Sequence, residues 1–516
     1  YEIDVLVGVE AYYTHDASLK GLTDDEKSAL KRRLGKAEGE AAAKAENARR
    51  ASRSHISAWA LDDEGLSNLW KLTSYSWNEG YFIKPRVDMT RLREFNAGLA
   101  VSTGCPGGIV AGLIRDGRYD EAHAKTEELI DIFGDRLIVE LMPHVVHECP
   151  DLGPRMVRLA REYDLMLVAT QDAHYPRQSD AAAQEVLLAI HTKDVLSNPP
   201  RTPSHPKGRF CFDTTNYWLR SRDEMETAFR EVPGLPFPVA REALDNSVLF
   251  AERCTARVKK RKIGEFFVAP EVPAEFADHE DWFYALLDAG CRRKLGAGLD
   301  ELQEPYLARL RHECHELSGL GFIPYFLMVV DWQAWARARG ILLGPGRGSA
   351  AGSLASYVLD MTAIDPIRWD LSFQRFIAPG QLELAEQGIT LPLPDFDADV
   401  AKSRRREVLN YLRGKYGEER VASIRTHNRF GGRMCLVDVG RVSEVPREEY
   451  AAVSALVVTA IEEDAQDEMS LKHVLESSEA GQKIAKTRPT LVKATMALEG
   501  QMRVSGVHAA GVVCSS

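Results

Sequence analysis

The sequence lacks the patterns that would set it apart from ordinary globular proteins. Its eight cysteines are scattered over 516 residues with no C-x-x-C pair, too few for a disulfide framework. The longest apolar run, near Phe322 to Val330, is about half the length of a membrane span. No basic stretch followed by an apolar core opens the chain, so no signal peptide is expected. These absences predict reduced, mostly buried thiols in a cytoplasmic protein with no membrane partner.

Composition and charge are close to globular averages, with 45% hydrophobic and 27% charged residues. This excludes collagen-like and disordered chains, and the length predicts three to four domains at roughly 150 residues each. The 65 basic and 76 acidic residues give a net charge of −11, which argues against a uniformly basic coat but leaves local basic patches open. The chain opens with Tyr1 rather than Met and stops just after an apolar run, so we expect both ends to be cut.

Apolar strand-like runs alternate with helix-like segments over the first 170 residues. The pattern predicts strands at 3–13, 56–61, 98–102, 137–141 and 166–169, and helices at 67–77, 119–133 and 154–163. Such alternation is typical of an α/β layer or barrel with polar groups at the carboxyl ends of the strands. Residues 36–50 are strong helix formers with few large apolar side chains, which predicts a solvated helical insertion.

Two breaks interrupt this alternation, a Pro-rich basic stretch at 199–209 and the run Lys259 to Lys262 followed by two prolines. We place the first major boundary at the second break. Beyond it the sequence predicts helices at 280–294, 304–318, 324–339 and 403–415, a Gly-rich loop at 344–353, a strand at 391–400 and a mostly helical acidic segment at 445–500.

Three alternating aspartates, Asp395, Asp397 and Asp399, are the most informative feature of the second half. On a strand they would project from one face, with Phe396 and Val400 on the other. Their mutual repulsion calls for cations, and two Mg²⁺ ions bridged by carboxylates form the clamp of nucleotidyl transfer. The alternative is an Asp-rich surface turn or an edge strand blunted by charge.

A Gly-rich loop about 45 residues upstream runs from Gly344 to Ser353. Its glycines let backbone amides converge on an anion, Arg347 offers a fork for phosphate oxygens, and Ser349 adds a hydroxyl. It is not a Walker A loop, and by itself it could be a plain turn. Downstream, residues 401–440 hold ten basic and four acidic side chains, an excess that suits a phosphate backbone but also a solvated helix face.

A second set of polar residues ends the apolar strands of the first 200 residues: Glu10, His55, Cys105, Asp172 and His174. A mixed His, Asp, Glu and Cys set suits Zn²⁺ or Mn²⁺. Taken singly, each of these residues is more often structural. The nearby His144 and His147 are expected at the surface.

Several ordered motifs carry a resemblance to a known family. "GPGRGSAAGSLASYVLDMTAIDP", "FQRFIAP" and "LPDFDAD" resemble the palm of the alpha subunit of bacterial DNA polymerase III, the C-family replicative polymerase. "GVEAYY", "STGCPGG", "IFGDRLIVEL", "ATQDAHY" and "RVSGVHAAGVV" stand in the same order as similar runs in that family. The departures are Gln374 in place of the family's glutamate before Arg375, and an insertion at 381–390.

The resemblance implies a nucleotidyltransferase that extends a primer 3′-OH on a DNA template, using deoxynucleoside triphosphates and two Mg²⁺ ions. Asp395 and Asp397 match the metal-binding aspartates, and Asp399 matches a third acidic position not usually assigned to catalysis. The matched nucleotide-binding positions are Arg347, Gly348, Ser349 and Arg375. The basic residues expected toward DNA are Arg404, Arg405, Arg429 and Arg433.

The first segment resembles the polymerase-and-histidinol-phosphatase domain, a distorted β/α barrel related to metal-dependent phosphoesterases. The resemblance implies a metal site at Glu10, His55, Cys105, Asp172 and His174, whose other ligands precede "GVEAYY" in the family. It likewise places a third catalytic carboxylate, the fingers and the regions that bind the sliding clamp and clamp loader after "GVHAAGVV". We therefore expect the 516-residue chain to extend primers poorly.

The expected fold class is mixed α/β and α+β, divided into a phosphatase-like domain at 1–265, a palm of the nucleotidyltransferase type at 266–425, a mostly helical thumb at 426–500 and a return into the palm at 501–516. The leading function is DNA polymerase. The alternatives are a metal-dependent phosphoesterase or 3′–5′ exonuclease carried by the first domain, and a non-catalytic structural subunit.

Overall fold

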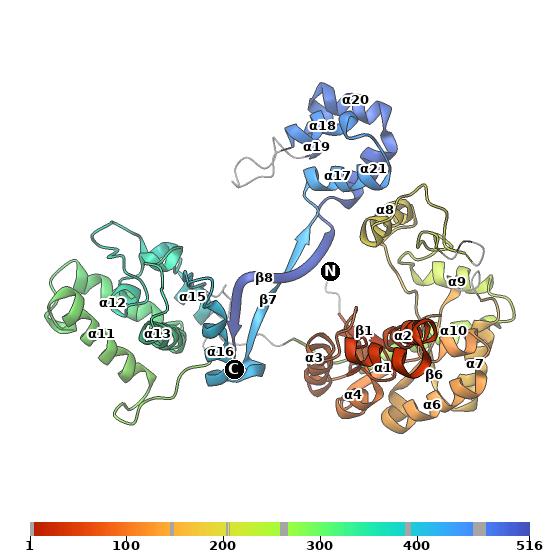
Figure 1. The fold of residues 1–516 in the computed structure, drawn as a ribbon, viewed down its shortest axis with the longest axis horizontal. Helices are drawn as coiled ribbons and strands as arrows, with labels where there is room; N and C mark the ends of the chain where they lie inside the picture. The colour runs from red at the N-terminus through yellow and green to blue at the C-terminus, as the bar shows by residue number, and fades with distance from the viewer. Residues whose placement is uncertain are drawn as a thin grey trace. The chain divides into compact units, whose positions relative to one another are not determined.

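The computed structural model divides the chain into two compact units (Figure 1). Unit 1 comprises residues 1–258 and 429–501, and unit 2 comprises residues 259–428 and 502–516. The structure describes residues 5–144, 149–202, 205, 207–258, 267–387, 394–457 and 471–515. The segment 429–501 therefore belongs to the same compact unit as the first half of the chain, although the 170 residues 259–428 separate them in sequence.

Unit 1 is built on a six-stranded mixed sheet with the order β3-β1-β2-β4-β5-β6. Its strands are β1 (Gly8–Tyr13), β2 (Ser54–Ala60), β3 (Arg86–Val87), β4 (Leu99–Ser102), β5 (Leu137–Leu141) and β6 (Met166–Ala169). β2 pairs antiparallel with β1 and β4, whereas β4, β5 and β6 run parallel. The parallel strands are apolar on both faces because helices cover both sides of such a sheet. The predicted α/β layer is confirmed, while closure into a barrel stays a prediction.

The helices in the first part of unit 1 are α1 (Asp24–Leu34), α2 (Lys36–Ala51), α3 (Asp63–Asn78), α4 (Met89–Glu94), α5 (Ala111–Arg115), α6 (Tyr119–Phe133), α7 (Leu152–Glu162), α8 (Ala181–Thr192), α9 (Arg222–Arg230) and α10 (Phe237–Arg253). Of these helices, the sequence predicted α2, α3, α6 and α7, and the other six were not predicted. α3 packs on β2, α7 on β5 and α10 on β6. α2 confirms the solvated insertion, since its buried residues are Gly39 and Ala43.

A helical cluster completes unit 1. It contains α17 (Gly432–Val442), α18 (Arg447–Leu456), α19 (Leu471–Ser477), α20 (Glu479–Thr487) and α21 (Pro489–Leu498), and α8 packs against α17 and α21 (Figure 1). The shared core joins Ala189 and Ile190 of α8 to Leu436 and Val439 of α17. The predicted helical character of 445–500 is confirmed for the described residues. Its role as a thumb stays a prediction.

Unit 2 combines a helical core with a long two-stranded ribbon. Its helices are α11 (His279–Leu295), α12 (Tyr306–Gly319), α13 (Ile323–Ala338), α14 (Leu354–Val358), α15 (Gln381–Glu386) and α16 (Arg405–Tyr416), and the ribbon pairs β7 (Val421–Arg429) with β8 (Met502–Cys514). The aromatic centre of the core is formed by Phe283, Phe322 and Phe326, which are fully buried. These three rings anchor α11 and α13.

The strand predicted at 391–400 is not formed as expected. Residues 394–399 belong to no strand, Val400 makes one antiparallel bridge to Leu343, and residues 391–393 lie outside the described residues. Pro394 has no amide to donate, and three like charges disfavour regular pairing. The predicted alternation holds in part, because Phe396 and Val400 pack against the core of unit 2.

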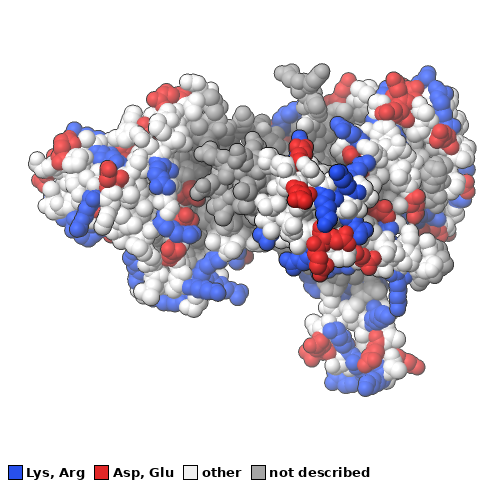
Figure 2. All heavy atoms as spheres, turned by 90° about the horizontal axis from the view of Figure 1, so that it is seen from above, with Lys and Arg blue, Asp and Glu red and all other residues white. Residues whose placement is uncertain are grey.

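Three sequence-level expectations can be compared with the surface and the thiols. Among the described residues, no helix has the length and apolarity to cross a membrane. Basic and acidic side chains are interspersed on the face shown in Figure 2, which is consistent with the absence of a uniform basic coat. All eight cysteines are free, and four of them are buried: Cys254, Cys291, Cys314 and Cys435.

Candidate functional site

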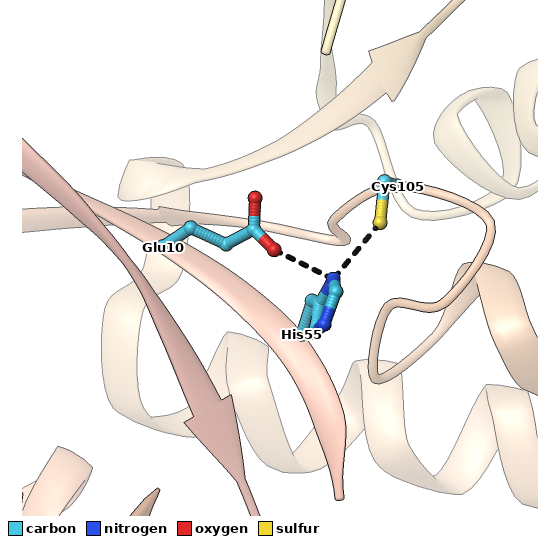
Figure 3. Close-up of side chains that lie close together, drawn as sticks. All are labelled: Glu10, His55 and Cys105. Atoms are coloured by element: carbon cyan, nitrogen blue, oxygen red, sulfur yellow. Dashed lines mark hydrogen bonds and ion pairs between the residues drawn. The ribbon is translucent and has the colours of Figure 1, made fainter. Parts of the chain in front are cut away.

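Glu10, His55 and Cys105 form a compact cluster in unit 1 (Figure 3). The His55 Nδ1 atom lies 2.6 Å from Glu10 Oε1 and 3.2 Å from Cys105 Sγ. The three ligand atoms lie within 4.8 Å of one another. Glu10 pairs in register with Ser57 and His55 with Tyr12, so the two side chains are diagonal neighbours on one face of the antiparallel pair.

Cys105 reaches this cluster because the loop after β4 is fastened to the backbone of His55. The His55 amide donates to Gly107 O and the Ile109 amide donates to His55 O, both at 2.9 Å. Gly108 is required there, because a Cβ would lie 2.4 Å from the Thr103 carbonyl oxygen. Gly108 thus lets the loop fold tightly on itself. Gly104 of the "STGCPGG" motif lets it approach β2, because a Cβ there would lie 3.0 Å from His55 O.

The surroundings of His55 favour its protonated, positively charged form. Hydrogen bonds with Cys105 and Glu10 raise the pKa of His55 to about 10, and the His55 hydrogen bond lowers the pKa of Glu10. Metal binding by these residues would release this proton, because a histidine ligand must be neutral. The nitrogen, oxygen and sulfur donors fit Zn²⁺ among the common metals.

Asp172 and His174 follow β6 and lie outside the three-residue cluster. The His174 Nδ1 atom is 2.7 Å from the Asp172 carbonyl oxygen and 3.9 Å from its carboxylate. Asp172 has a left-handed backbone with φ of 49°, a conformation that aspartate tolerates better than most residues. β4, β5 and β6 run parallel, so Asp172 and His174 follow the sheet at the same end as the loop that carries Cys105. All five predicted residues therefore gather at one end of the sheet.

Glu140 is a buried carboxyl group that the sequence analysis missed. It accepts hydrogen bonds from the hydroxyls of Ser102 and Thr170, the second at 2.6 Å. Ser102 in turn accepts from the amide of Gly104, which precedes Cys105. Burial raises the pKa of Glu140, against the effect of these hydrogen bonds. Its signal in the sequence was a single acid inside the apolar strand Leu137–Leu141.

His144 is buried, so its predicted surface position is wrong. Its side chain packs against the Tyr217 ring with centroids 4.5 Å apart. Neither ring nitrogen has a hydrogen-bond partner among the described residues, and burial lowers its pKa to about 4. Its burial beside Tyr217, which is distant in sequence, is a tertiary feature that local polarity did not reveal. His147 lies outside the described residues.

In unit 2 the Gly-rich loop lies against the aspartate segment. The Gly344 amide donates to Asp399 O at 2.9 Å. The Arg347 guanidinium lies 3.3 Å from an Asp397 carboxylate oxygen and 3.5 Å from one of Asp399. Gly348 has φ of 69°, and a Cβ there would lie 2.7 Å from Asp397 Oδ2. The loop thus places the Arg347 guanidinium and the backbone of Gly348 beside the carboxylates.

Tyr325 of α13 supports the aspartate segment from the core side. Burial raises the pKa of its phenol, the charges of Asp395 and Asp397 raise it further, and a hydrogen bond from the Phe396 amide opposes them. The ring stacks on Phe267 with centroids 4.9 Å apart. The sequence analysis missed Tyr325, because nothing in the sequence marked which face of α13 meets the aspartates.

The remaining predicted residues are spread over both units. Ser349 begins the short 3-10 turn Ser349–Gly352, and Arg375 is exposed at the end of the turn Phe373–Arg375, which packs beside it. Arg404 pairs with Glu407 through two bonds of 2.8 Å, and Arg405 is half-buried. The exposed residues Arg429 and Arg433 belong to unit 1.

The two sites define a class of protein. One α/β domain carries a cluster of side chains that could hold a metal ion, and a second domain has a Gly-rich loop in contact with carboxylates. Comparisons with known families agree with both halves. Residues 1–144 match the PHP domain, and residues 281–516 match the bacterial DNA polymerase III alpha NTPase domain. Over these regions the chain is similar to the bacterial DNA polymerase III alpha subunits.

Individual relatives are similar over most of this chain. It is 32% identical to the DNA polymerase III subunit alpha of Treponema pallidum, over 89% of this chain and 36% of that protein. It is 31% identical to that of Thermus aquaticus, over 90% of this chain and 40% of that protein. It is 32% identical to that of Caulobacter vibrioides, over 88% of this chain and 37% of that protein. The chain therefore spans well under half the length of these relatives.

Proposed function

We propose that these residues are part of a template-directed DNA polymerase that adds deoxynucleotides to a primer 3′-OH by a two-metal mechanism. The observation that carries this proposal is the contact of the Gly-rich loop with the aspartates, in which Arg347 lies within 3.5 Å of both Asp397 and Asp399. A phosphate-binding loop beside paired carboxylates is the combination that phosphoryl transfer needs.

The residues present fit divalent magnesium. Asp395 and Asp397 offer only oxygen donors, which suit Mg²⁺ better than softer metals, and the missing side chain at Gly348 leaves space beside Asp397. Asp395 and Asp397 would hold two Mg²⁺ ions, which when bound lower the pKa of the attacking hydroxyl and neutralise the leaving pyrophosphate.

The protein side chains then position the reactants. Arg347 balances the repulsion among the carboxylates in the structure, and its fork can bind triphosphate oxygens in two-pronged fashion. Ser349 and Arg375 would add hydrogen-bond donors for the same triphosphate. Phe396 packs against the core of unit 2, which restrains the backbone between Asp395 and Asp397. Such fixed geometry accounts for much of the rate enhancement in phosphoryl transfer.

Primer extension by the full-length protein tests this proposal with a matched set of variants. We expect Asp395→Asn and Asp397→Asn each to lower the rate by about two orders of magnitude or more. Asp399→Asn removes the same charge from the same segment, beside Gly344, and should have a much smaller effect. Extension that survives Asp395→Asn would contradict the proposal.

The cluster of Glu10, His55 and Cys105 favours a second activity, metal-dependent phosphoester hydrolysis such as 3′–5′ exonuclease trimming. Zn²⁺ or Mn²⁺ bound by these residues, with Asp172 and His174, would supply an activated water. We expect His55→Ala and Asp172→Asn to abolish 3′ trimming and to leave extension intact. The exposed His191→Ala is the control. Trimming unaffected by either variant would remove this domain from the chemistry.

DNA is the partner that the basic residues favour. We infer that Arg404, Arg405, Arg429 and Arg433 contact the primer-template backbone, although Arg404 would first have to exchange its pair with Glu407. The logarithm of the DNA-binding constant falls linearly with the logarithm of the salt concentration. Each lost phosphate contact should make this slope shallower by about one unit. A cytoplasmic location, deoxynucleoside triphosphates as substrates, and a sliding clamp and clamp loader as further partners follow from the same proposal.

A further inference from the structure

Two exposed cations of unit 1, Arg53 and Lys84, lie over the ring of Tyr12. The Arg53 Cζ atom is 5.4 Å and the Lys84 Nζ atom 5.8 Å from the centroid of the Tyr12 ring. Tyr12 belongs to β1, Arg53 comes directly before β2, and Lys84 belongs to the loop between α3 and β3. We call these three residues the Tyr12 patch.

The Tyr12 patch adjoins the cluster of Glu10, His55 and Cys105 shown in Figure 3. Glu10 and Tyr12 are two residues apart on β1, so their side chains leave the same face of the sheet. Tyr12 pairs in register with His55, and the two rings meet edge to face with centroids 5.3 Å apart. One aromatic ring therefore separates the two cations from the candidate metal site.

The two cations of the patch have donors available for a ligand. Arg53 donates one hydrogen bond, from Nη1 to the Ala51 carbonyl at 3.3 Å. Within the described part of the chain, neither Arg53 nor Lys84 forms an ion pair with a carboxylate. Both side chains are exposed, so their remaining donors can reach a ligand. Two like charges beside one ring repel each other, and the attraction of the ring for cations offsets this repulsion only in part.

The loop that carries Lys84 is fastened by the fully buried Arg86. The Arg86 guanidinium donates to the Gly80 carbonyl at 3.0 Å and lies over the Phe82 ring. Ile83 has a φ of 67°, a left-handed conformation that a β-branched residue rarely adopts. Because the loop is held in this way, Lys84 is positioned before a ligand binds, which reduces the entropy lost on binding.

We propose that the Tyr12 patch binds the phosphate next to the scissile one when the 3′ end of a DNA strand occupies the metal site. Arginine binds phosphate oxygens through its planar fork and lysine as a point charge. Neighbouring phosphates of a strand are one nucleotide apart, so a strand whose terminal linkage lies at the cluster presents its next phosphate nearby. The Tyr12 ring holds the two cations in place for this contact.

The inference rests on the phosphoester hydrolysis proposed above and names its substrate class. A strand with at least two phosphodiester linkages can use both the metal site and the Tyr12 patch. An isolated phosphomonoester has no second phosphate for Arg53 and Lys84. The site should therefore prefer the end of a strand to a small phosphate ester.

Trimming by the full-length protein with Mn²⁺ tests the proposal on a short single strand in which one phosphodiester is replaced by an uncharged methylphosphonate. Moving the replacement along the strand locates the contact. We expect the linkage next to the 3′-terminal one to have the largest effect among the uncleaved linkages, and to raise KM by about tenfold. The value of kcat should change little, because a phosphate away from the reacting bond contributes equally to the ground state and the transition state.

Arg53→Gln and Lys84→Gln should each raise KM for the unmodified strand by about three- to tenfold, as for lost hydrogen bonds to a charged group. The double variant should no longer respond to the methylphosphonate, because effects of groups in contact are not additive. Arg158→Gln removes an exposed arginine from α7 and is the control. It should keep the KM of the wild type and the full methylphosphonate effect.

Fluorescence anisotropy of the same strands in EDTA gives a second readout that needs no bound metal. The same methylphosphonate should weaken binding to the wild type and not to the double variant. A protein that trims no strand would contradict the proposed hydrolysis, and the binding measurement would still decide the role of the Tyr12 patch. Absence of the methylphosphonate effect on binding to the wild type, or its survival in the double variant, would overturn the proposal.

Discussion

The Glu313 carboxylate of α12 accepts a hydrogen bond of 2.9 Å from the hydroxyl of Ser353, the last residue of the Gly-rich loop. It also accepts from the amides of Leu354 and Ala355, both at 2.9 Å, and so satisfies the first turn of α14. Arg309 pairs with Glu313 at 2.6 Å and donates to the Gly352 carbonyl. A buried ion pair therefore fastens the carboxyl end of the loop to the core of unit 2.

Loss of this carboxylate should destabilise unit 2. Glu313→Ala leaves Arg309 and two amides without their acceptor, and breaking a buried pair in this way typically costs about 3–5 kcal/mol. Urea unfolding of the 516-residue chain measures the change. Glu316→Ala on the same helix is the control, with an expected change within about 0.5 kcal/mol. Equal effects of the two variants would show that the pair does not hold the loop.

Gly348→Ala should impair nucleotide addition by the full-length protein. The new Cβ would meet the Asp397 carboxylate at 2.7 Å and would occupy a left-handed backbone, which costs a non-glycine residue about 1–2 kcal/mol. Steady-state primer extension measures the loss. Gly414→Ala in α16 meets no atom within 4 Å and should instead stabilise the helix by about 0.5–1 kcal/mol. Normal extension by Gly348→Ala would show that the loop does not need to approach Asp397 closely.

Glu140 should make stability depend on pH. Burial raises its folded-state pKa above the ordinary value for a glutamate, so the folded state binds the proton more tightly than the unfolded state. This contribution is fully present below the unfolded pKa and is lost as pH rises through the folded pKa. Glu140→Gln removes the titration and keeps the shape.

We therefore expect the unfolding free energy of the wild type, relative to Glu140→Gln, to fall as pH increases from about 4 to 8. Urea unfolding at several pH values tests this, with Glu162→Gln on the outer end of α7 as a surface control. Parallel pH profiles for wild type and Glu140→Gln would indicate that Glu140 is ionised normally in the folded state.

Cys105 should contribute to metal affinity, whereas the half-buried Cys149 should not. Its sulfur lies 3.2 Å from His55 Nδ1, within the cluster of ligand atoms. We expect Cys105→Ala to weaken Zn²⁺ binding by at least about tenfold, as measured by competition with a chromophoric chelator. Cys149→Ala should retain wild-type affinity. Unchanged affinity in Cys105→Ala would assign Cys105 to packing.

Much of the local structure was determined by the sequence. The apolar runs of β5 and β6 and the amphipathic pattern of α6 predicted those elements with the bounds that the structure has. These patterns specify the secondary structure locally, because a parallel strand buried on both faces and a helix with one apolar face each have a distinctive spacing of apolar residues. The five polar residues at strand ends were also marked by their position, and their role as ligands stays a prediction.

Only the tertiary structure decided the contacts between residues that are distant in sequence. The packing of α8 against α17 and α21, the Glu313 anchor beneath Ser353, the place of Tyr325 and the burial of His144 all depend on long-range packing. The aspartates were found from their spacing, but the geometry around them was not, since the predicted strand reduces to one bridge at Val400. The sequence determined which groups could act. Burial and close backbone approach decided which of them meet, because these arise only when the two sides of a site fold together.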